Sequence, residues 1–355
     1  MNLYKSPISR AVAATFLIPC LSQAEIEIEV YGAANASIES LNNKSTNKKI
    51  TEVSNNHSVF GVKGAVDAGS GVKGVFLYDA FVGLDNSAGG GGGGSLFGGG
   101  RDGYVGLNSG FGTIALGFHG RPWKTSTNHL DLFGSTIADY SAIMGSTRGG
   151  AYFDGGIGNA LIYFSPDMNG LKVHAQWGAD EADNSTNDVG IQANYTTGPI
   201  YIAVSHDIDG QGSGAQDISA TKGGGSYQWN DTQFVGLLES ISDGDANSRS
   251  AFYLGASHKL GAITAKVALA AAGDSDASGA DDGATYFTIG AEHRYSSNLA
   301  TYILLSSIKN DDGGRYQYIS APHTSSNGNT TLTSAGKDSG VFALGFKLDF
   351  GWKNK

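Results

Sequence analysis

The stretch that decides the fold is VFALGFKLDFGW, from Val341 to Trp352. Every second residue from Phe342 onward is large and apolar, and the residues between are small or charged. Successive side chains of a strand point to opposite faces, so this pattern predicts a strand with one apolar and one polar face. Twelve residues is long for a soluble strand but suits one that crosses a bilayer at a tilt. Alone, the stretch leaves both a soluble β-sandwich and a membrane barrel open.

The other end of the chain predicts export. Residues 1–24 resemble a secretory signal, with Lys5 and Arg10 before a short apolar run and small residues before a cleavage site after Ala24. Residues 25–355 form the predicted mature domain. Pro19 stands where a lipoprotein signal needs a small residue, so Cys20 is not expected to carry lipid. Without Cys20, the mature chain has no thiol for a disulfide, for catalysis or for a metal.

Composition narrows the fold class further. Loss of Lys5 and Arg10 changes the formal net charge from −10 to −12, which disfavours nucleic-acid binding. No apolar run is long enough for a membrane helix. With 54 glycines, 6 prolines and no linker, residues 25–355 are expected to form one unit. Two structures fit: a soluble secreted β protein, or a closed barrel that crosses lipid without an open sheet edge.

Alternating connection lengths decide between them. Long polar connections lie near 42–56, 85–100, 119–150, 181–188, 209–218, 243–248, 274–283 and 310–338. Short turns rich in Gly, Asn, Asp and Pro lie near 67–71, 108–112, 166–170, 197–199, 230–232, 259–261 and 296–299. Eight long and seven short connections imply sixteen strands. The sequence thus predicts an all-β fold, a 16-stranded antiparallel transmembrane β-barrel, wide enough for an aqueous channel.

Inward and outward faces follow from strand parity. Apolar side chains alternate with polar or small ones in 72–82, 200–208, 252–257 and 287–292. In the first of these segments, Lys73 and Asp79 fall on the inward face and are predicted pore-wall residues. The segment 219–229 is the weakest strand prediction, because Lys222 is followed by three glycines and no apolar face forms.

Five fragments in order resemble the trimeric general porins of Gram-negative bacteria, of the neisserial type. They are Val30-Tyr31-Gly32; Phe60 to Gly64 with Gly71-Val72-Lys73; Arg101 with Tyr104 to Leu107 and Gly110-Phe111-Gly112; Tyr163 with Ser165-Pro166 and Gly170-Leu171; and Phe346 to Phe350. The resemblance implies a homotrimer. It also implies that the third long loop, 119–150, folds into each lumen and narrows it.

The resemblance further implies that acidic loop residues face basic wall residues across the constriction. The acidic candidates are Asp131 and Asp139. The basic candidates are Lys63, Arg101, Arg121 and Arg148. The family often has Arg or Lys where this chain has Val59, Ala115, Phe118 and Ile162. With this thinned set of bases and an acidic chain, weak cation preference is expected. Residues after Phe350 extend beyond the usual family terminus, and their role stays open.

Other motifs favour plain interpretations. The glycine run 89–94 lacks the Lys-Ser/Thr of a phosphate loop. The aspartates around 274–282 predict a solvated outer loop, with weak divalent-cation binding as the alternative. His119 and His129 fall on the third loop without metal-ligand spacing and are expected to be ordinary lumen or loop residues, with titration within the pore as the alternative. Ser205-His206 are adjacent and so point to opposite faces, which disfavours catalysis. Neither an enzymatic activity nor a metal or other cofactor is expected.

The leading hypothesis is a bacterial outer-membrane channel for passive diffusion of small hydrophilic solutes and ions. Its expected partners are two further copies of the chain, outer-membrane lipid and lipopolysaccharide, and not nucleic acid. The alternative is a substrate-selective channel, for example for sugars, with Trp123, Phe133 and Tyr140 as an aromatic track. A third hypothesis, a structural or adhesive protein with a closed lumen, predicts no conductance.

Overall fold

A computed structural model describes residues 26–43, 48–84, 97–146, 152–181, 186–211, 216–242, 247–318, 323–324 and 334–354. The predicted signal segment 1–24, the glycine run 89–94 and Arg148 lie outside these residues. None of the helices in the described part of the chain has the length and apolar character needed to cross a membrane.

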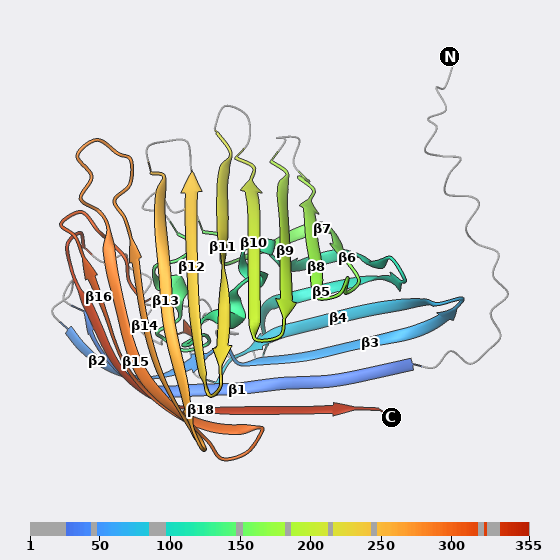
Figure 1. Cartoon of the computed structure of the whole chain (residues 1–355), viewed down its shortest axis with the longest axis horizontal. Helices are drawn as coiled ribbons and strands as arrows, with labels where there is room; N and C mark the ends of the chain where they lie inside the picture. Colours follow the sequence, from blue (N-terminus) through green and yellow to red (C-terminus); the bar gives the residue numbers. More distant parts are fainter. Residues whose placement is uncertain are drawn as a thin grey trace.

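The described residues fold almost entirely into strands (Figure 1). The strands are β1 (Ile26–Asn43), β2 (Lys48–Asn56), β3 (Val59–Gly69), β4 (Val72–Val82), β5 (Phe97–Ser109), β6 (Gly112–Gly120), β7 (Gly156–Phe164), β8 (Leu171–Gly178), β9 (Asp188–Thr197), β10 (Ile200–Asp209), β11 (Ile218–Trp229), β12 (Thr232–Ser242), β13 (Arg249–Leu260), β14 (Ile263–Ala272), β15 (Ala284–Arg294), β16 (Leu299–Asn310), β17 (His323–Thr324) and β18 (Ser339–Lys353). All pairings between them are antiparallel. All seven predicted short turns join consecutive strands, and the weakly predicted segment 219–229 is strand β11.

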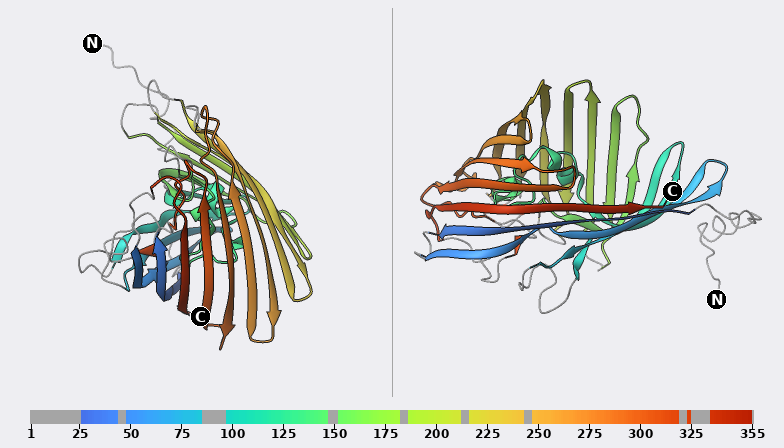
Figure 2. Two further views of the ribbon diagram at one scale, coloured as in Figure 1. Left: turned by 90° about the vertical axis from the view of Figure 1, so that its left-hand side faces the viewer. Right: turned by 90° about the horizontal axis from the view of Figure 1, so that it is seen from below.

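These labels describe a closed barrel of sixteen strands. β2 and β3 are two halves of one barrel strand, since β1 pairs with β3 over Ile26–Ala33 and with β2 over Ala36–Asn43. His57, at a φ of 61°, interrupts them. The two-residue β17 pairs with Asn55 and Asn56, at the end of β2 next to His57. β18 pairs with β1 from Lys353↔Glu29 to Ser339↔Asn43 and closes the ring (Figure 2).

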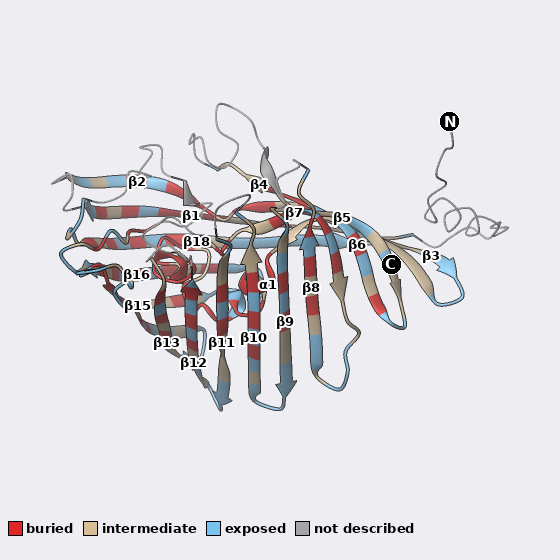
Figure 3. Cartoon of the chain, turned by 90° about the horizontal axis from the view of Figure 1, so that it is seen from above, coloured by how far each residue is buried: buried red, intermediate tan, exposed pale blue. Residues whose placement is uncertain are grey.

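The closing strand has the predicted faces. Its even residues from Phe342 to Trp352 are 40–62% exposed on the outer surface, whereas Val341 and Ala343 are buried. Buried and exposed residues alternate in the same way along the other strands (Figure 3). An outer surface of exposed leucine, isoleucine, valine and phenylalanine around a ring of paired strands satisfies every requirement of a lipid-facing barrel.

One predicted connection is shorter than expected. Residues 42–56 were predicted as a long polar loop, but β1 continues to Asn43 and β2 begins at Lys48. The inward side chains of β2, among them Ser54 and Asn56, are polar and buried, while Val53 is 58% exposed. With polar residues on the inner face and few apolar ones outside, this hairpin carries no lipid-facing stripe that would mark it as strand.

The third long loop folds inside the barrel. It holds a one-turn helix, α1 (Pro122–Thr125), and two 3₁₀ turns, η3 (Asn128–Leu130) and η4 (Tyr140–Ala142). Its apolar side chains pack in one buried cluster against inward side chains of β11 to β16 and β18. The loop members are Trp123, Leu130, Phe133, Ile137, Ala138, Tyr140, Ala142, Ile143, Met144 and Phe153. The loop is thereby held against one side of the inner wall.

Candidate functional site

Asp131 holds the third loop in shape. Its carboxylate accepts hydrogen bonds from the backbone N–H groups of Phe133 (3.0 Å) and Tyr140 (2.9 Å) and from the hydroxyl of Tyr253 on β13 (3.2 Å). Its side chain is almost fully buried. Burial, and then the nearby charge of Asp139, raise the pKa of Asp131 well above its usual range. Asp131 therefore contacts the loop and the wall rather than the water of the lumen.

Asp139 is the more accessible loop acid. It precedes η4 and accepts hydrogen bonds from the backbone N–H groups of Ser141 (2.9 Å) and Ser135 (3.3 Å). The residue is partly exposed. Ser135 in turn accepts a hydrogen bond from the side-chain amide of Asn35 on β1 through its carbonyl. Asp139 thus lies on the part of the loop that reaches toward the first strand.

Arg121 anchors the beginning of the loop. Its guanidinium lies 3.0 Å from Asp188 at the start of β9 and 3.2 Å from Asp209 at the end of β10. It also lies over the ring of Phe153. Only 8% of its side chain is exposed, so its charge is engaged with these two carboxylates. Lys124 similarly pairs with Asp154 at 3.2 Å across the base of the loop.

Lys63 and Lys73 lie on the inward face near the short turns. Lys63 pairs with Glu29 of β1 at 3.1 Å, and Lys73 pairs with Glu27 at 2.9 Å. These four side chains are 34–46% exposed although they point into the barrel. Solvent therefore reaches the inner surface at this end of the ring.

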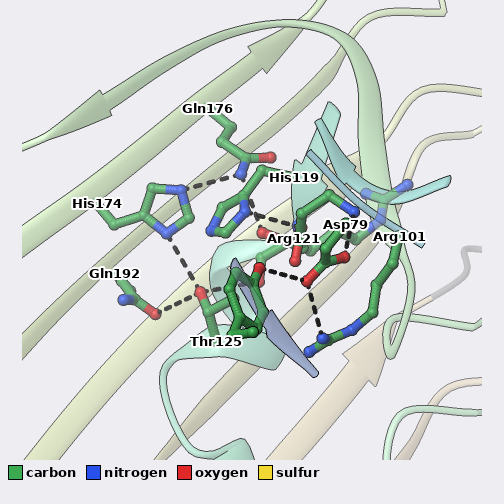
Figure 4. A network of polar contacts seen from close by, with 11 residues as sticks. Asp79, Arg101, His119, Arg121, Thr125, His174, Gln176 and Gln192 are labelled. Atoms are coloured by element: carbon green, nitrogen blue, oxygen red, sulfur yellow. Dashed lines mark hydrogen bonds and ion pairs between the residues drawn. The ribbon is translucent and has the colours of Figure 1, made fainter. Parts of the chain in front are cut away.

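Arg101 and Asp79 form an ion pair further along the same wall (Figure 4). Arg101 Nη1 lies 3.1 Å from Asp79 Oδ2, which also accepts a hydrogen bond from the Tyr31 hydroxyl. The β4–β5 register shifts next to Asp79, where Asp102 is the paired residue. Because of this bulge, Arg101 reaches an inward carboxylate although its neighbour Asp102 is also inward.

A histidine and amide network continues this wall (Figure 4). His119, the penultimate residue of β6 rather than a loop residue, has Nδ1 2.8 Å from Asp102 Oδ1. His174 contacts Gln176 at 2.9 Å and Thr125 of α1 at 3.2 Å. His129, by contrast, lies edge-on to the ring of Tyr201.

Three basic side chains that contact the loop were not selected as candidates by sequence reasoning: Lys222, Lys347 and Arg249, whose guanidinium donates to the carbonyls of Ser146 (2.7 Å) and Ile143 (2.6 Å). Lys222 of β11 is fully buried, with Nζ 3.2 Å from the centroid of the Trp123 ring and 3.2 Å from the Tyr140 hydroxyl. Lys347 of β18 donates to the carbonyl of Gly134 at 3.3 Å. Strand parity alone could have identified Lys347, which is an odd residue of the closing strand. Lys222 lacked even that signal, because its strand has no apolar face.

Two further ion pairs line the wall beneath the loop. Arg249 pairs with Glu239 at 2.7 Å, and the Glu239 carboxylate accepts the backbone N–H of Gly145. Lys266 pairs with Glu292 at 3.1 Å. Both bases face a carboxylate, so these inner-wall charges are largely balanced within the barrel.

Two weaker candidates have plain surroundings. Carboxylate oxygens of Asp274, Asp281 and Asp311 lie within 4.8 Å of one another on exposed outer loops, an arrangement common for solvated acids. Ser205 is buried beside Ser126, whereas His206 is exposed and contacts Thr221. Ser205 and His206 therefore lie on opposite faces of β10 and form no nucleophile–base pair.

A closed antiparallel barrel with an apolar outer band, a charged inner wall and an inward loop defines the class of outer-membrane channel proteins. The family model described as Gram-negative porin matches residues 11–313, and the chain belongs to this family of the bacterial outer membrane. No match is found among curated protein sequences.

Solved porin structures share the fold. An anion-selective porin from Comamonas acidovorans superposes with a TM-score of 0.77 at 21% identity, covering 92% of this chain and 100% of that one. The trimer form of OmpT from Vibrio cholerae superposes with a TM-score of 0.63 at 16% identity, covering 92% of this chain and 99% of that one. OmpF of Salmonella typhi in complex with daunomycin superposes with a TM-score of 0.64 at 12% identity, covering 92% of this chain and 98% of that one.

Proposed function

We propose that the protein is a passive diffusion channel for small hydrophilic solutes and ions, acts without enzymatic turnover, and assembles as a homotrimer. The observation that carries the proposal is the inner wall at β1, β3 and β4. Charged side chains there point into the ring yet are about 34–46% exposed, while the outer surface is apolar. Water inside and lipid outside is the arrangement that a pore requires.

The third loop supports a constriction. Its buried cluster contacts the wall from β11 to β16 and β18, and α1 contacts β8 to β11. No member of that cluster comes from β3 to β7 among the described residues. Solutes would therefore pass between the loop and the wall that carries Lys63 and Arg101, with Asp139 as the accessible acid opposite. Arg121 and Asp131 instead hold the base and the shape of the loop, and Arg148 stays a proposed basic residue of the constriction.

Weak cation preference is proposed for this pore. Several of its wall bases are paired with a carboxylate, as in Lys63–Glu29 and Lys266–Glu292, so the constriction field is modest. The chain as a whole has a net charge of −10, which raises the local concentration of cations near its mouths. The Comamonas porin, which is 21% identical to this chain, is described as anion-selective, and that selectivity is not carried over to this chain.

Planar-bilayer recording tests both proposals. The ion current is expected to scale linearly with salt concentration, and the solute flux linearly with solute concentration. In a KCl gradient, the reversal potential is expected to shift modestly toward the equilibrium potential of potassium. A reversal potential near the chloride value would overturn the cation preference. Complete absence of current from a correctly folded barrel would overturn the channel function and favour a structural or adhesive role.

A substrate-selective channel is the second candidate. The loop aromatics Trp123, Phe133 and Tyr140 are at most 4% exposed, so they pack in the loop–wall contact and offer no track to solutes. The uncovered wall instead presents Tyr104 and Phe164, which are only partly buried. These partly exposed aromatic rings on the uncovered wall are the observation that favours a substrate-selective channel.

A further inference from the structure

The inner wall at the short-turn end carries a groove with two chemically different halves. The groove has a volume of about 250 Å³ and is formed by β1, β3, β4, β5 and the end of β18. Cross-strand register places its side chains in a row, because Lys353 pairs with Glu29, Glu29 with Lys63, Lys63 with Leu77 and Leu77 with Tyr104. Residues paired across neighbouring strands share a face, so the row runs continuously from charged to apolar.

Charges of both signs fill the first half. Lys63 lies 3.1 Å from Glu29, and Lys353 lies 3.7 Å from Glu27. These side chains are 34–59% exposed. Ion pairs this open to water contribute only about 0–1 kcal/mol, so a solute that carries both charges can replace them at small cost.

Apolar side chains fill the second half. Leu77 and Tyr104 continue the row, and the next row places Val75 opposite Ala65. Leu77, Val75 and Tyr104 are only partly buried, so apolar surface faces the water of the lumen. The Tyr104 ring is backed edge-on by His119 and at a tilt by Phe164, which keeps it in place. General diffusion does not require such a surface.

We propose that this groove is a transit subsite for small zwitterions with an apolar side chain, such as hydrophobic α-amino acids. The solute's ammonium would meet Glu29, its carboxylate would meet Lys63, and its side chain would cover Leu77 and Tyr104. The groove volume falls just under the roughly 300 Å³ at which pockets for drug-sized ligands begin, which fits one amino acid better than a longer peptide. This inference rests on the proposed channel function and names a solute class for it.

Four probes test the groove on the full-length channel in a planar bilayer. L-Phenylalanine carries both charges and an apolar group, glycine lacks the apolar group, 2-phenylethylamine lacks the anion, and 3-phenylpropionate lacks the cation. L-Phenylalanine is expected to halve the ion current at a concentration about tenfold lower than glycine, since partial burial of an aromatic ring is worth roughly one decade in affinity. It is also expected to act at a lower concentration than the two singly charged probes, because each of them lacks one of the two ionic contacts. Equal block by all four probes overturns the proposal.

Two variants locate the effect. Leu77→Thr replaces apolar surface with a smaller side chain that carries a hydroxyl, and it is expected to weaken block by L-phenylalanine about three- to tenfold, with block by glycine unchanged. Lys63→Gln is expected to weaken block by both amino acids. Its matched control is Lys259→Gln, which removes the same charge from the short-turn end of β13, outside the groove.

The outcomes separate the two proposals. If Lys259→Gln weakens block as much as Lys63→Gln, general lumen charge explains the effect and the groove is overturned. Should Leu77→Thr fail to assemble, the four-probe comparison on the unmodified channel still decides. Current without discrimination among probes overturns only the groove, whereas absence of current overturns the channel function.

Discussion

At the residue scale, Lys222 is, with Arg249, one of the side chains that hold the third loop against the wall. A lysine almost never lies fully buried unless its charge is compensated. Here the ammonium lies over the Trp123 ring and donates a hydrogen bond to the Tyr140 hydroxyl. Lys222 is also the residue of β11 that is paired with Glu239 of β12. A desolvated cation–π contact contributes about 2 kcal/mol. The residue thus joins two points of the loop to β11.

Lys222→Met should therefore destabilise the folded barrel by about 2 kcal/mol, because the aliphatic stem remains while the cation–π and hydrogen-bond contacts are lost. The midpoint of unfolding by guanidinium chloride in detergent micelles measures the change. Lys259→Met is the matched control at an exposed position and should change stability by less than about 0.5 kcal/mol. Equal shifts in the two variants would show that Lys222 does not hold the loop.

At this scale, the sequence predicted which strand residues face inward, but not which side chains the third loop contacts. Parity alone placed Lys73 and Asp79 on the inward face, because a strand has a period of two whatever its neighbours are. The path of a loop depends instead on which side chains meet across the lumen. Asp131 illustrates the difference, since its acidic character was visible in the sequence, but its bonds to Phe133 and Tyr140 depend on the turn of the loop and its bond to Tyr253 comes from a distant strand.

At the element scale, the closing strand was predictable from its own residues as far as Trp352, whereas the role of the residues after Phe350 was not. β18 continues past Phe350 to Lys353 and pairs with β1 through Gly351, Trp352 and Lys353. Asn354 then bonds β1 twice by its side chain, accepting from the N–H of Ile28 (2.6 Å) and donating to the carbonyl of Ile26 (2.7 Å). The added residues lengthen the seam that closes the barrel.

This seam gives a graded prediction. Asn354→Ala removes both side-chain bonds and should lower barrel stability by about 1–2 kcal/mol, whereas Asn354→Asp keeps the acceptor for Ile28 and should lose roughly half as much. Guanidinium midpoints of the two variants measure the order. An Asn354→Asp variant as unstable as Asn354→Ala would show that the bond accepted from Ile28 contributes nothing.

At the scale of the whole molecule, the outer surface combines large and small side chains. Exposed large side chains occur around the ring, for example Leu238 (70%) on β12 and Val105 (65%) on β5. On β1 and β4, outward positions include Ala34, Ala36 and Gly74, which are small. Small outward residues let two barrels approach closely in the membrane, where packing rather than hydrophobic transfer drives association. This side is therefore the expected contact between copies in the proposed trimer.

A bulky residue on that side should separate the copies. Ala34→Trp is expected to convert a trimer that survives in mild detergent into monomers, because the indole prevents close approach of β1 to a neighbouring barrel. The matched control is Ala256→Trp on the outward face of β13, where the same side chain would face lipid. Molecular mass by light scattering distinguishes the states, and bilayer currents should change from three equal closing steps to one. If both variants remain trimeric with three steps, the contact lies elsewhere on the barrel; if the unmodified protein is monomeric, the trimer itself is wrong.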